Sequence, residues 1–334
     1  MRLGRLKLAR SVEILGTGLF LALPFILSAL NVRSSPYILD LLSMVGLYAL
    51  LSLSLNVILG LAGMFHMGHA AFFAVGAYVT ANLNLTYGWS ILATLPAAAL
   101  GAGLLALAVA IPVIRLRGDY LLIVTIGIVE IVKIALTNDV FGLTGGPNGL
   151  IGIARPMVFG YRVARPVDFF YLIWIMVAFS ALLFHWLENS RFGRALKYIK
   201  EDAVAAEGMG VDATAYKLMA FVIGAAWAGM AGTIFAAKMR TISPESFTFG
   251  ESVVMFTIVI LGGSGNQKGV VLGSFLVMGL PELFRDFQDL RLLAYGAALV
   301  AMMIFRPQGL WPPKPTQYRL PPPYDEKYPA GGSG

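Results

Sequence analysis

Two charged residues lie within an otherwise apolar stretch of this 334-residue sequence. Glu130 and Lys133 stand about halfway along residues 119–137, where most neighbours are aliphatic. On a helix, a spacing of three residues puts both on one face, where they can neutralise each other. Each charge alone would cost roughly 2.5–3.5 kcal/mol at the centre of a bilayer. We therefore predict that they pair inside a helical bundle, either as a structural ion pair or as part of a path for a zwitterion.

A glycine-containing stretch from Gly60 to Gly76 interrupts two apolar runs. Broken backbone at membrane depth is tolerated only inside protein or beside a water-filled cavity, so this stretch indicates a translocation pathway. We expect His69 within it to be a hydrogen-bonded structural residue rather than a proton carrier. A similar run at 259–263 repeats residues 57–60, either as a parallel internal repeat or through common small-residue packing.

The elements that hold these residues must be membrane helices. The chain is 58% hydrophobic and 13% charged, with a mean hydropathy of +0.76, whereas soluble domains are roughly 45–50% apolar and about 25% charged. A spanning helix needs about 20 apolar residues. We predict an all-α, polytopic membrane protein with about ten transmembrane helices, or eight or nine if short segments only dip in. They are expected near 12–30, 37–60, 70–86, 91–114, 119–137, 167–187, 217–238, 251–263, 269–284 and 292–305.

The distribution of Lys and Arg predicts the orientation. With the N-terminus inside, roughly twice as many basic residues fall on the inner side as on the outer, which favours both termini in the cytoplasm. Residues 1–11 then form a cytoplasmic N-terminal segment, and 12–305 form the membrane domain. Residues 306–334 form a Pro-rich cytoplasmic tail without apolar periodicity, and 331–334 resemble a linker.

Several classes of chemistry have no support in the sequence. The chain has no Cys and only three His, and it lacks an HExxH pair, so we expect no metal and no thiol chemistry. Its basic residues lie between apolar spans rather than in one patch, so we expect no nucleic acid partner. No Walker motif occurs, and we expect no bound cofactor.

The segment 188–216 is polar and charged, although it separates two strongly apolar spans. Its alanines form a small-residue surface among acidic side chains, and two glycines then end the predicted helix. Such a helix fits a groove on a soluble partner, and the alternative is an amphipathic loop on the membrane surface. The residues concerned are Glu201, Asp202, Ala203, Ala205, Ala206, Glu207, Gly208 and Gly210.

This segment resembles the cytoplasmic loop of ABC-type branched-chain amino acid permeases. Nine residues match that family's loop pattern: Ser190, Gly193, Arg194, Ile199, Glu201, Asp202, Ala205, Ala206 and Gly210. Lys200 and Gly208 depart from it, standing where Arg and Ala are usual. Further matches extend over most of residues 45–311, among them Leu55-Asn56, Gly60-x-x-Gly63, Gly68-His69-Ala70-Ala71-Phe72-Phe73, Gly76-Ala77-Tyr78, Thr144-Gly145-Gly146, Ile242-Ser243-Pro244 and Arg306-Pro307-Gln308-Gly309-Leu310. His66 stands where relatives carry a small hydroxyl residue, and the chain resembles the longer of the family's paired permeases.

The resemblance implies the permease subunit of a bacterial inner-membrane importer for Leu, Ile and Val, with urea or short amides as alternatives. It implies a second permease, two cytoplasmic ATP-binding subunits that carry out ATP hydrolysis, and an extracytoplasmic binding protein. The chain itself would not be an enzyme. A secondary transporter or channel would instead need ion-coupling groups or a filter, and an intramembrane enzyme would need a nucleophile and base.

Two sets of site residues follow. The expected coupling residues are Arg194, Glu201, Asp202, Ala205, Ala206, Glu207 and Gly210. The candidate pathway residues are Asn56, Gly60, Gly63, His69, Tyr78, Glu130, Lys133, Thr144, Gly145 and Gly146.

Overall fold

The computed structural model describes residues 24, 35–114, 116, 118–140, 142–158, 160–283, 296, 300, 304–306 and 309–312. The predicted N-terminal segment 1–11, nearly all of the predicted span 12–30, most of 292–305 and most of the tail lie outside the described residues.

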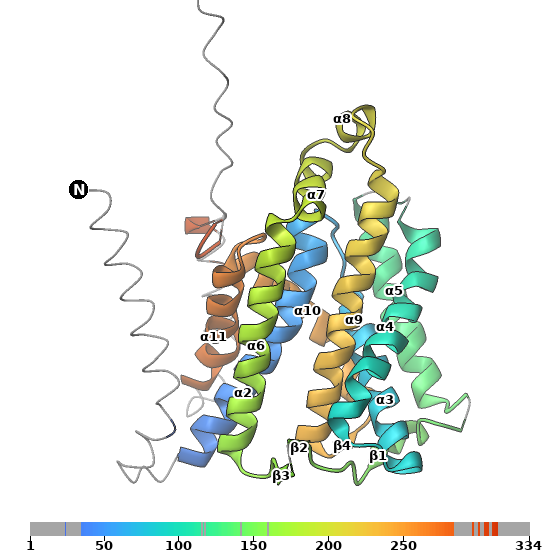
Figure 1. Ribbon diagram of the computed structural model, residues 1–334, viewed down its shortest axis with the longest axis vertical. Helices are drawn as coiled ribbons and strands as arrows, with labels where there is room; N and C mark the ends of the chain where they lie inside the picture. The colour runs from blue at the N-terminus through green and yellow to red at the C-terminus, as the bar shows by residue number, and fades with distance from the viewer. Residues whose placement is uncertain are drawn as a thin grey trace, which may run out of the picture.

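The described chain is mainly helical (Figure 1), as predicted. Its principal helices are α2 (Ser35–Asn56), α3 (His69–Tyr87), α4 (Ile91–Val113), α5 (Asp119–Thr137), α6 (Pro166–Asn189), α9 (Ala213–Met239), α10 (Phe249–Gly262) and α11 (Gln267–Leu283). Eight of the ten predicted spans therefore correspond to observed helices, within a few residues for most. Within the described residues, six segments are long and apolar enough to cross a membrane. The chain is thus a multi-pass helical membrane protein.

The remaining elements are short and lie between these helices. A π-helical turn, η1 (Val57–Leu61), follows α2, and α7 (Arg191–Glu201) and α8 (Ala203–Gly208) join α6 to α9. The 3-10 turns are η2 (Gly146–Asn148) and η3 (Pro244–Phe247). Strand β1 (Leu150–Ile151) pairs antiparallel with β4 (Thr241–Ile242), and β2 (Met157–Val158) pairs antiparallel with β3 (Tyr161–Arg162).

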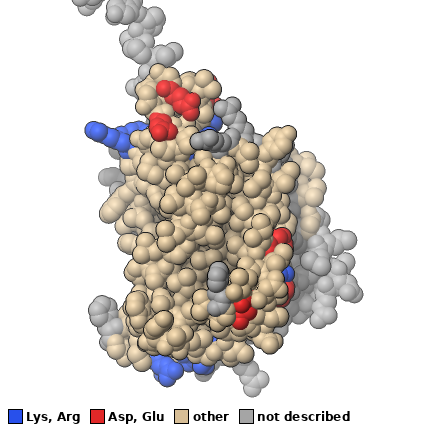
Figure 2. All heavy atoms as spheres, turned by 90° about the vertical axis from the view of Figure 1, so that its right-hand side faces the viewer, with Lys and Arg blue, Asp and Glu red and all other residues tan. Residues whose placement is uncertain are grey.

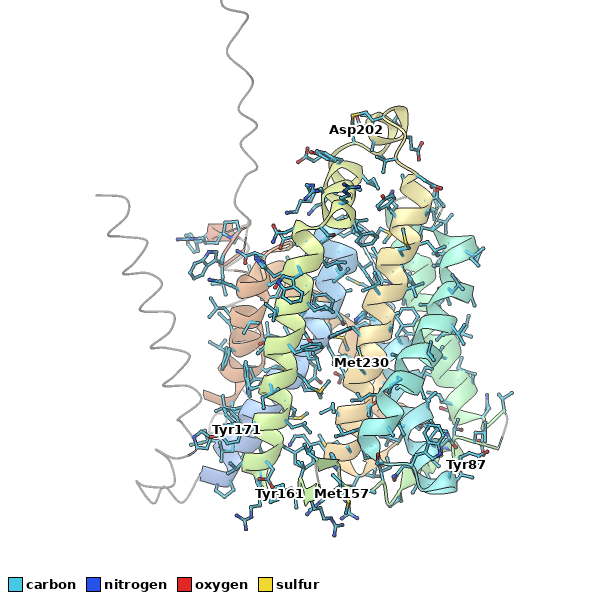
Figure 3. The ribbon with its side chains drawn as sticks, in the orientation of Figure 1. Tyr87, Met157, Tyr161, Tyr171, Asp202 and Met230 are labelled. Atoms are coloured by element: carbon cyan, nitrogen blue, oxygen red, sulfur yellow. The ribbon has the colours of Figure 1, made fainter. Side chains whose placement is uncertain are left out.

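The helices alternate between two ends of the molecule. One end carries α7 and α8 and is called the loop end; the other carries the four strands and is called the strand end (Figure 1). Figure 3 shows Asp202 at the tip of the loop end and Tyr87, Met157 and Tyr161 at the strand end. The C-terminal end of α4, the α7–α8 loop and the turn at 263–266 between α10 and α11 all lie toward the loop end.

The core forms around α2 and α9. Side chains from 49 to 62 are almost all buried, because α2 is enclosed by α6, α9, α10 and α11. Small residues let α9 lie close to α3 and α4: a Cβ on Gly76 would collide with the carbonyl of Gly229, and one on Gly229 would come within 2.6 Å of the Ala98 oxygen. Close backbone approach through small residues is typical of membrane helices.

Helix α5 lies at the edge of the bundle. Its apolar side chains Tyr120, Ile123, Ile131 and Ile134 are exposed. In Figure 2, the face on that side is largely uncharged between the two ends of the molecule. This pattern fits a surface that contacts lipid or another membrane protein.

Candidate functional site

The first part of the candidate site is a helix break at the loop end. Helix α2 passes into η1, where Ala62 N donates to Val57 O over 3.3 Å, and residues 62–68 are not helical. Gly63 has a φ of +69°, a left-handed conformation that favours glycine. The predicted break is confirmed but is shorter than expected. It ends at His69, so Gly76 lies inside α3 and serves helix packing.

A second break touches the first. Between α10 and α11, Gly265 N donates to Asn56 Oδ1 over 2.8 Å. Gly60 has to be small at this contact, because a Cβ there would overlap Asn56 Oδ1 and lie 2.6 Å from Gly265 N. Asn56 therefore connects the end of α2, next to η1, to the turn at 263–266.

The centre of the site contains two buried histidines. His69 Nε2 lies 2.7 Å from Ser54 Oγ, so His69 is hydrogen-bonded, as expected for a structural residue. His66 is 1% exposed, and its ring centroid lies 4.8 Å from that of Phe221. Among the described residues, neither ring nitrogen of His66 has a hydrogen-bond partner. Ala70 N, at the start of α3, donates to Ser252 Oγ of α10 over 2.9 Å.

At the strand end, the structure corrects the predicted ion pair. Lys133 Nζ lies 3.1 Å from both carboxylate oxygens of Glu245 in η3, not against Glu130. Glu130 is exposed on the surface of α5. Because η3 packs beside α5, the long Lys133 side chain reaches a carboxylate that the helical spacing could not reveal. The prediction that Glu130 and Lys133 pair is therefore wrong.

The loop after α5 adds further candidates to the strand end. Thr144 donates its N–H to Asp139 Oδ1 over 2.7 Å and its hydroxyl to Leu136 O over 2.6 Å. The hydroxyl oxygen also lies 2.9 Å from Asp139 Oδ1, and hydrogen bonding from Thr144, chiefly from its backbone N–H, holds the pKa of Asp139 below its usual range. Gly145 and Gly146 adopt positive φ values of +69° and +63° in the turn that leads into η2.

The predicted pathway residues thus fall into separate groups. Asn56, Gly60 and Gly63 lie at the loop end, and Lys133, Thr144, Gly145 and Gly146 lie at the strand end. Tyr78 is buried, and its ring centroid is 5.9 Å from that of Phe247 in η3. His69 is the first residue of α3 and lies beside Ser54 of α2.

The α7–α8 loop forms the second candidate site, and its local structure follows from two caps. Ser190 Oγ accepts from Gly193 N over 3.2 Å at the start of α7. Asp202 Oδ1 accepts from Val204 N and Ala205 N over 2.9 and 3.0 Å at the start of α8. Asp202 therefore has a capping role, because such a side chain satisfies the free N–H groups of a helix N-terminus. Gly210, with a φ of +85°, lies just past the end of α8.

The residues of the predicted small-residue surface differ in their exposure to solvent. Ala205 is exposed, whereas Ala206 is fully buried against Ile199 and Ala213. Ala206 therefore does not lie on the exposed surface that the sequence pattern predicted, and its role in coupling stays a prediction. The orientation of α8 on α7 decides this, and the sequence spacing does not show it.

Two apolar residues that the sequence reasoning missed stand out beside Ala205. Val204 is 66% exposed and Met209 is 70% exposed. Glu201 and Glu207 are exposed as well. Arg194 donates to the Asn189 carbonyl over 2.6 Å and so contributes to the α6–α7 corner. The sequence signal that could have found Val204 and Met209 is an apolar residue within an otherwise charged loop, because apolar side chains that are exposed there can mark a contact surface.

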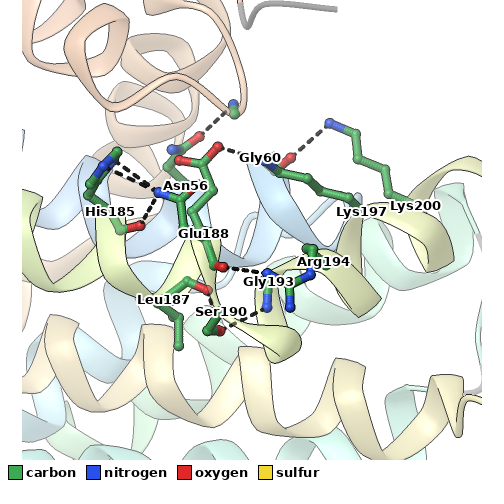
Figure 4. Close-up of polar contacts among 12 residues, drawn as sticks. Asn56, Gly60, His185, Leu187, Glu188, Ser190, Gly193, Arg194, Lys197 and Lys200 are labelled. Carbon is green, nitrogen blue, oxygen red and sulfur yellow. Dashed lines mark hydrogen bonds and ion pairs between the residues drawn. The ribbon is translucent and has the colours of Figure 1, made fainter. Parts of the chain in front are cut away.

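Lys200 joins the two candidate sites. Its Nζ donates to the Gly60 carbonyl over 2.8 Å, while Lys197 pairs with Glu188 over 2.8 Å (Figure 4). Burial lowers the pKa of Lys200. The α7–α8 loop therefore contacts the helix break directly.

A multi-pass helical bundle with two touching helix breaks and a projecting helical loop is an arrangement suited to a membrane transport protein. Residues 37–306 match the model of the family described as branched-chain amino acid transport system / permease component. The chain belongs to this family.

Individual relatives agree with this assignment. The chain is 41% identical to the high-affinity branched-chain amino acid transport system permease protein LivM of Salmonella typhimurium, over 84% of the chain and 71% of that protein. It has the same identity and coverage with LivM of Escherichia coli. It is 27% identical to the permease protein LivH of Escherichia coli, over 79% of the chain and 90% of LivH. No solved structure matches the chain.

Proposed function

We propose that this chain is the permease subunit of an ABC importer for the branched-chain amino acids Leu, Ile and Val. The observation that carries the proposal is the projecting α7–α8 loop, with exposed Val204 and Met209 at its tip and Lys200 bonded to the helix break. The likeness to LivM, a permease of a high-affinity branched-chain amino acid system, supports the substrate class.

The loop end faces the cytoplasm and meets two ATP-binding subunits there. Its apolar side chains, surrounded by charged ones, suit a groove on a soluble partner, and the binding energy of such contacts concentrates in a few central residues. The strand end faces outward and receives substrate from a binding protein. Both termini are then cytoplasmic, the chain crosses the bacterial inner membrane about ten times, and Ala205, Glu201 and Glu207 belong to the docking surface.

A second permease covers the exposed face of α5. Glu130 is exposed on this helix among aliphatic side chains, and a charge facing hydrocarbon is costly. A neighbouring protein that supplies polar groups removes this cost. The chain is similar to both LivM and LivH, which supports a pair of related permeases with the pathway between them.

Within that pathway, the pair Lys133–Glu245 forms the outer recognition point. A zwitterionic amino acid presents a carboxylate to Lys133 and an ammonium to Glu245, so it can exchange with the existing pair without leaving a charge unpaired. Thr144, Gly145 and Gly146 shape the adjoining loop. Asn56, Gly60 and Gly63 form the inner end, and Tyr78 and His69 lie between.

Uptake into proteoliposomes tests the function. The chain is co-expressed with its partner permease and ATP-binding subunits, reconstituted, and supplied with ATP on the loop side and loaded binding protein on the strand side. We expect ATP-dependent uptake of leucine, isoleucine and valine, and no uptake of urea. Omission of this chain is the control. Uptake of urea alone, or leucine uptake that is independent of ATP, would contradict the proposal.

A further inference from the structure

The Lys200 side chain is partly exposed, and it extends along the surface of the bundle to the end of η1. Its Nζ donates to Gly60 O over 2.8 Å, and its stem lies so close to Gly63 that a Cβ there would come within 2.7 Å of Lys200 Cγ. Lys197, on the same helix, pairs instead with Glu188 near the end of α6. Lys200 is thus a direct contact between α7 and η1 (Figure 4).

The position of this contact has a physical reason. Carbonyl groups in the last turn of a helix have no partners within that helix. The Gly60 oxygen is such a group, because η1 ends at Leu61 and the following residues are not helical. A lysine ammonium at a helix C-terminus supplies the missing hydrogen bond and is favoured by the helix dipole.

The contact continues into the second helix break. Asn56 lies one turn before Gly60, and its Oδ1 accepts from Gly265 N at the turn between α10 and α11. Gly60 lies directly beside this hydrogen bond, because a Cβ added at Gly60 would lie 2.6 Å from Gly265 N. A displacement of Lys200 therefore acts on both breaks, 62–68 directly and 263–266 through Asn56.

We propose that Lys200 is a positioning residue that transmits movement of the α7–α8 loop to the two helix breaks through Gly60 and Asn56. The inference rests on the proposed function, in which ATP-binding subunits move this loop. ATP hydrolysis by those subunits then opens the pathway only while Lys200 Nζ is hydrogen-bonded to the Gly60 carbonyl.

The test compares substrate moved per ATP hydrolysed by the complete reconstituted transporter. Lys200→Met removes the donor but keeps most of the stem, Lys200→Arg keeps a donor, and Lys197→Met is the control on the same helix. For Lys200→Met we expect the ATP-binding subunits to co-purify and to hydrolyse ATP, while substrate moved per ATP falls at least about fivefold, the lower end of usual coupling strengths. Lys200→Arg and Lys197→Met should keep the wild-type ratio.

A second pair of variants displaces Lys200 without removing its charge. Gly63→Ala and Gly88→Ala both place a Cβ at a left-handed φ, +69° and +67°, but only the first meets Lys200, since Gly88 has no atom within 4 Å. We expect Gly63→Ala to lower the ratio and Gly88→Ala to leave it unchanged.

An unchanged ratio in both Lys200→Met and Gly63→Ala would overturn the inference. So would a loss of ATP-binding subunits and hydrolysis in proportion to transport, since Lys200 would then serve only docking or folding. The wild-type ratio is measured first, so failure of the proposed function appears as no uptake by the wild type, whereas failure of the inference appears only in the variants.

Discussion

At the scale of single residues, the side chains that link distant segments matter most. Lys133 and Glu245 are 112 positions apart in sequence, and Lys200 and Gly60 are 140 apart. The sequence indicates that a charge near the centre of α5 needs a partner, because an unpaired one is costly in hydrocarbon. It does not identify Glu245, which becomes available only once η3 packs against α5.

The residue-scale prediction concerns the Lys133–Glu245 pair. Reversing one charge, in Lys133→Glu or Glu245→Lys, places like charges together, and we expect leucine uptake to fall by at least about tenfold. Folded yield should change little, because a partly exposed pair contributes about 0–1 kcal/mol. The double exchange restores the attraction and should recover part of the uptake.

Folded yield is measured by size-exclusion chromatography, and uptake in proteoliposomes. The control is Glu130→Gln, which leaves the pair Lys133–Glu245 in place. In the Glu130→Gln protein, the charge exchanges should change leucine uptake by the same factors as in the wild type. Single variants that transport at the wild-type rate would show that this pair is not on the pathway. Failure of the double exchange to improve on either single variant would show that the two residues do not act together.

At the scale of elements, hydropathy predicts most of the fold because each helix carries a long apolar run. The observed α4 and α5 coincide with the predicted spans within one residue at each end. Breaks are harder to place. The sequence pattern predicts that Gly76 lies at the end of the break, but Gly76 lies inside α3, where it permits contact with Gly229. A glycine needed for packing and a glycine needed for a turn look alike in a single sequence.

Packing of α3 on α9 makes the element-scale prediction. In Gly76→Ala, the added methyl group meets the backbone of Gly229, which cannot move aside without shifting α9. We expect a loss of about 1–3 kcal/mol of stability, as is usual for overpacking, seen as a lower unfolding temperature in detergent. Gly127→Ala is the matched control, since Gly127 is also helical and has no atom within 4 Å.

The control should be neutral or stabilising, because Ala is favoured over Gly in a helix by about 0.8–1.0 kcal/mol. Equal unfolding temperatures for the Gly76→Ala and Gly127→Ala proteins would argue against close α3–α9 contact in solution.

At the scale of the whole molecule, the two ends have different tasks. The loop end combines the projecting α8, the Lys200–Gly60 contact and both helix breaks, whereas the strand end combines the Lys133–Glu245 pair with the turn at 142–149. The sequence predicts this division, because the polar segments fall alternately on two sides. It does not predict that Ala206 points inward, since that depends on how α8 folds back onto Ile199 and Ala213.

The central claim is that the loop end meets ATP-binding subunits in the cytoplasm while the strand end faces outward, and cysteine labelling tests it most directly. The chain has no native cysteine, so single cysteines at Ala205 and Asn148, both exposed, report one end each. In intact cells, a membrane-impermeant maleimide should label Asn148→Cys and not Ala205→Cys. In inside-out vesicles, Ala205→Cys should be labelled, and added ATP-binding subunits should protect it. Labelling of Ala205→Cys from outside, or equal labelling with and without those subunits, would contradict the account.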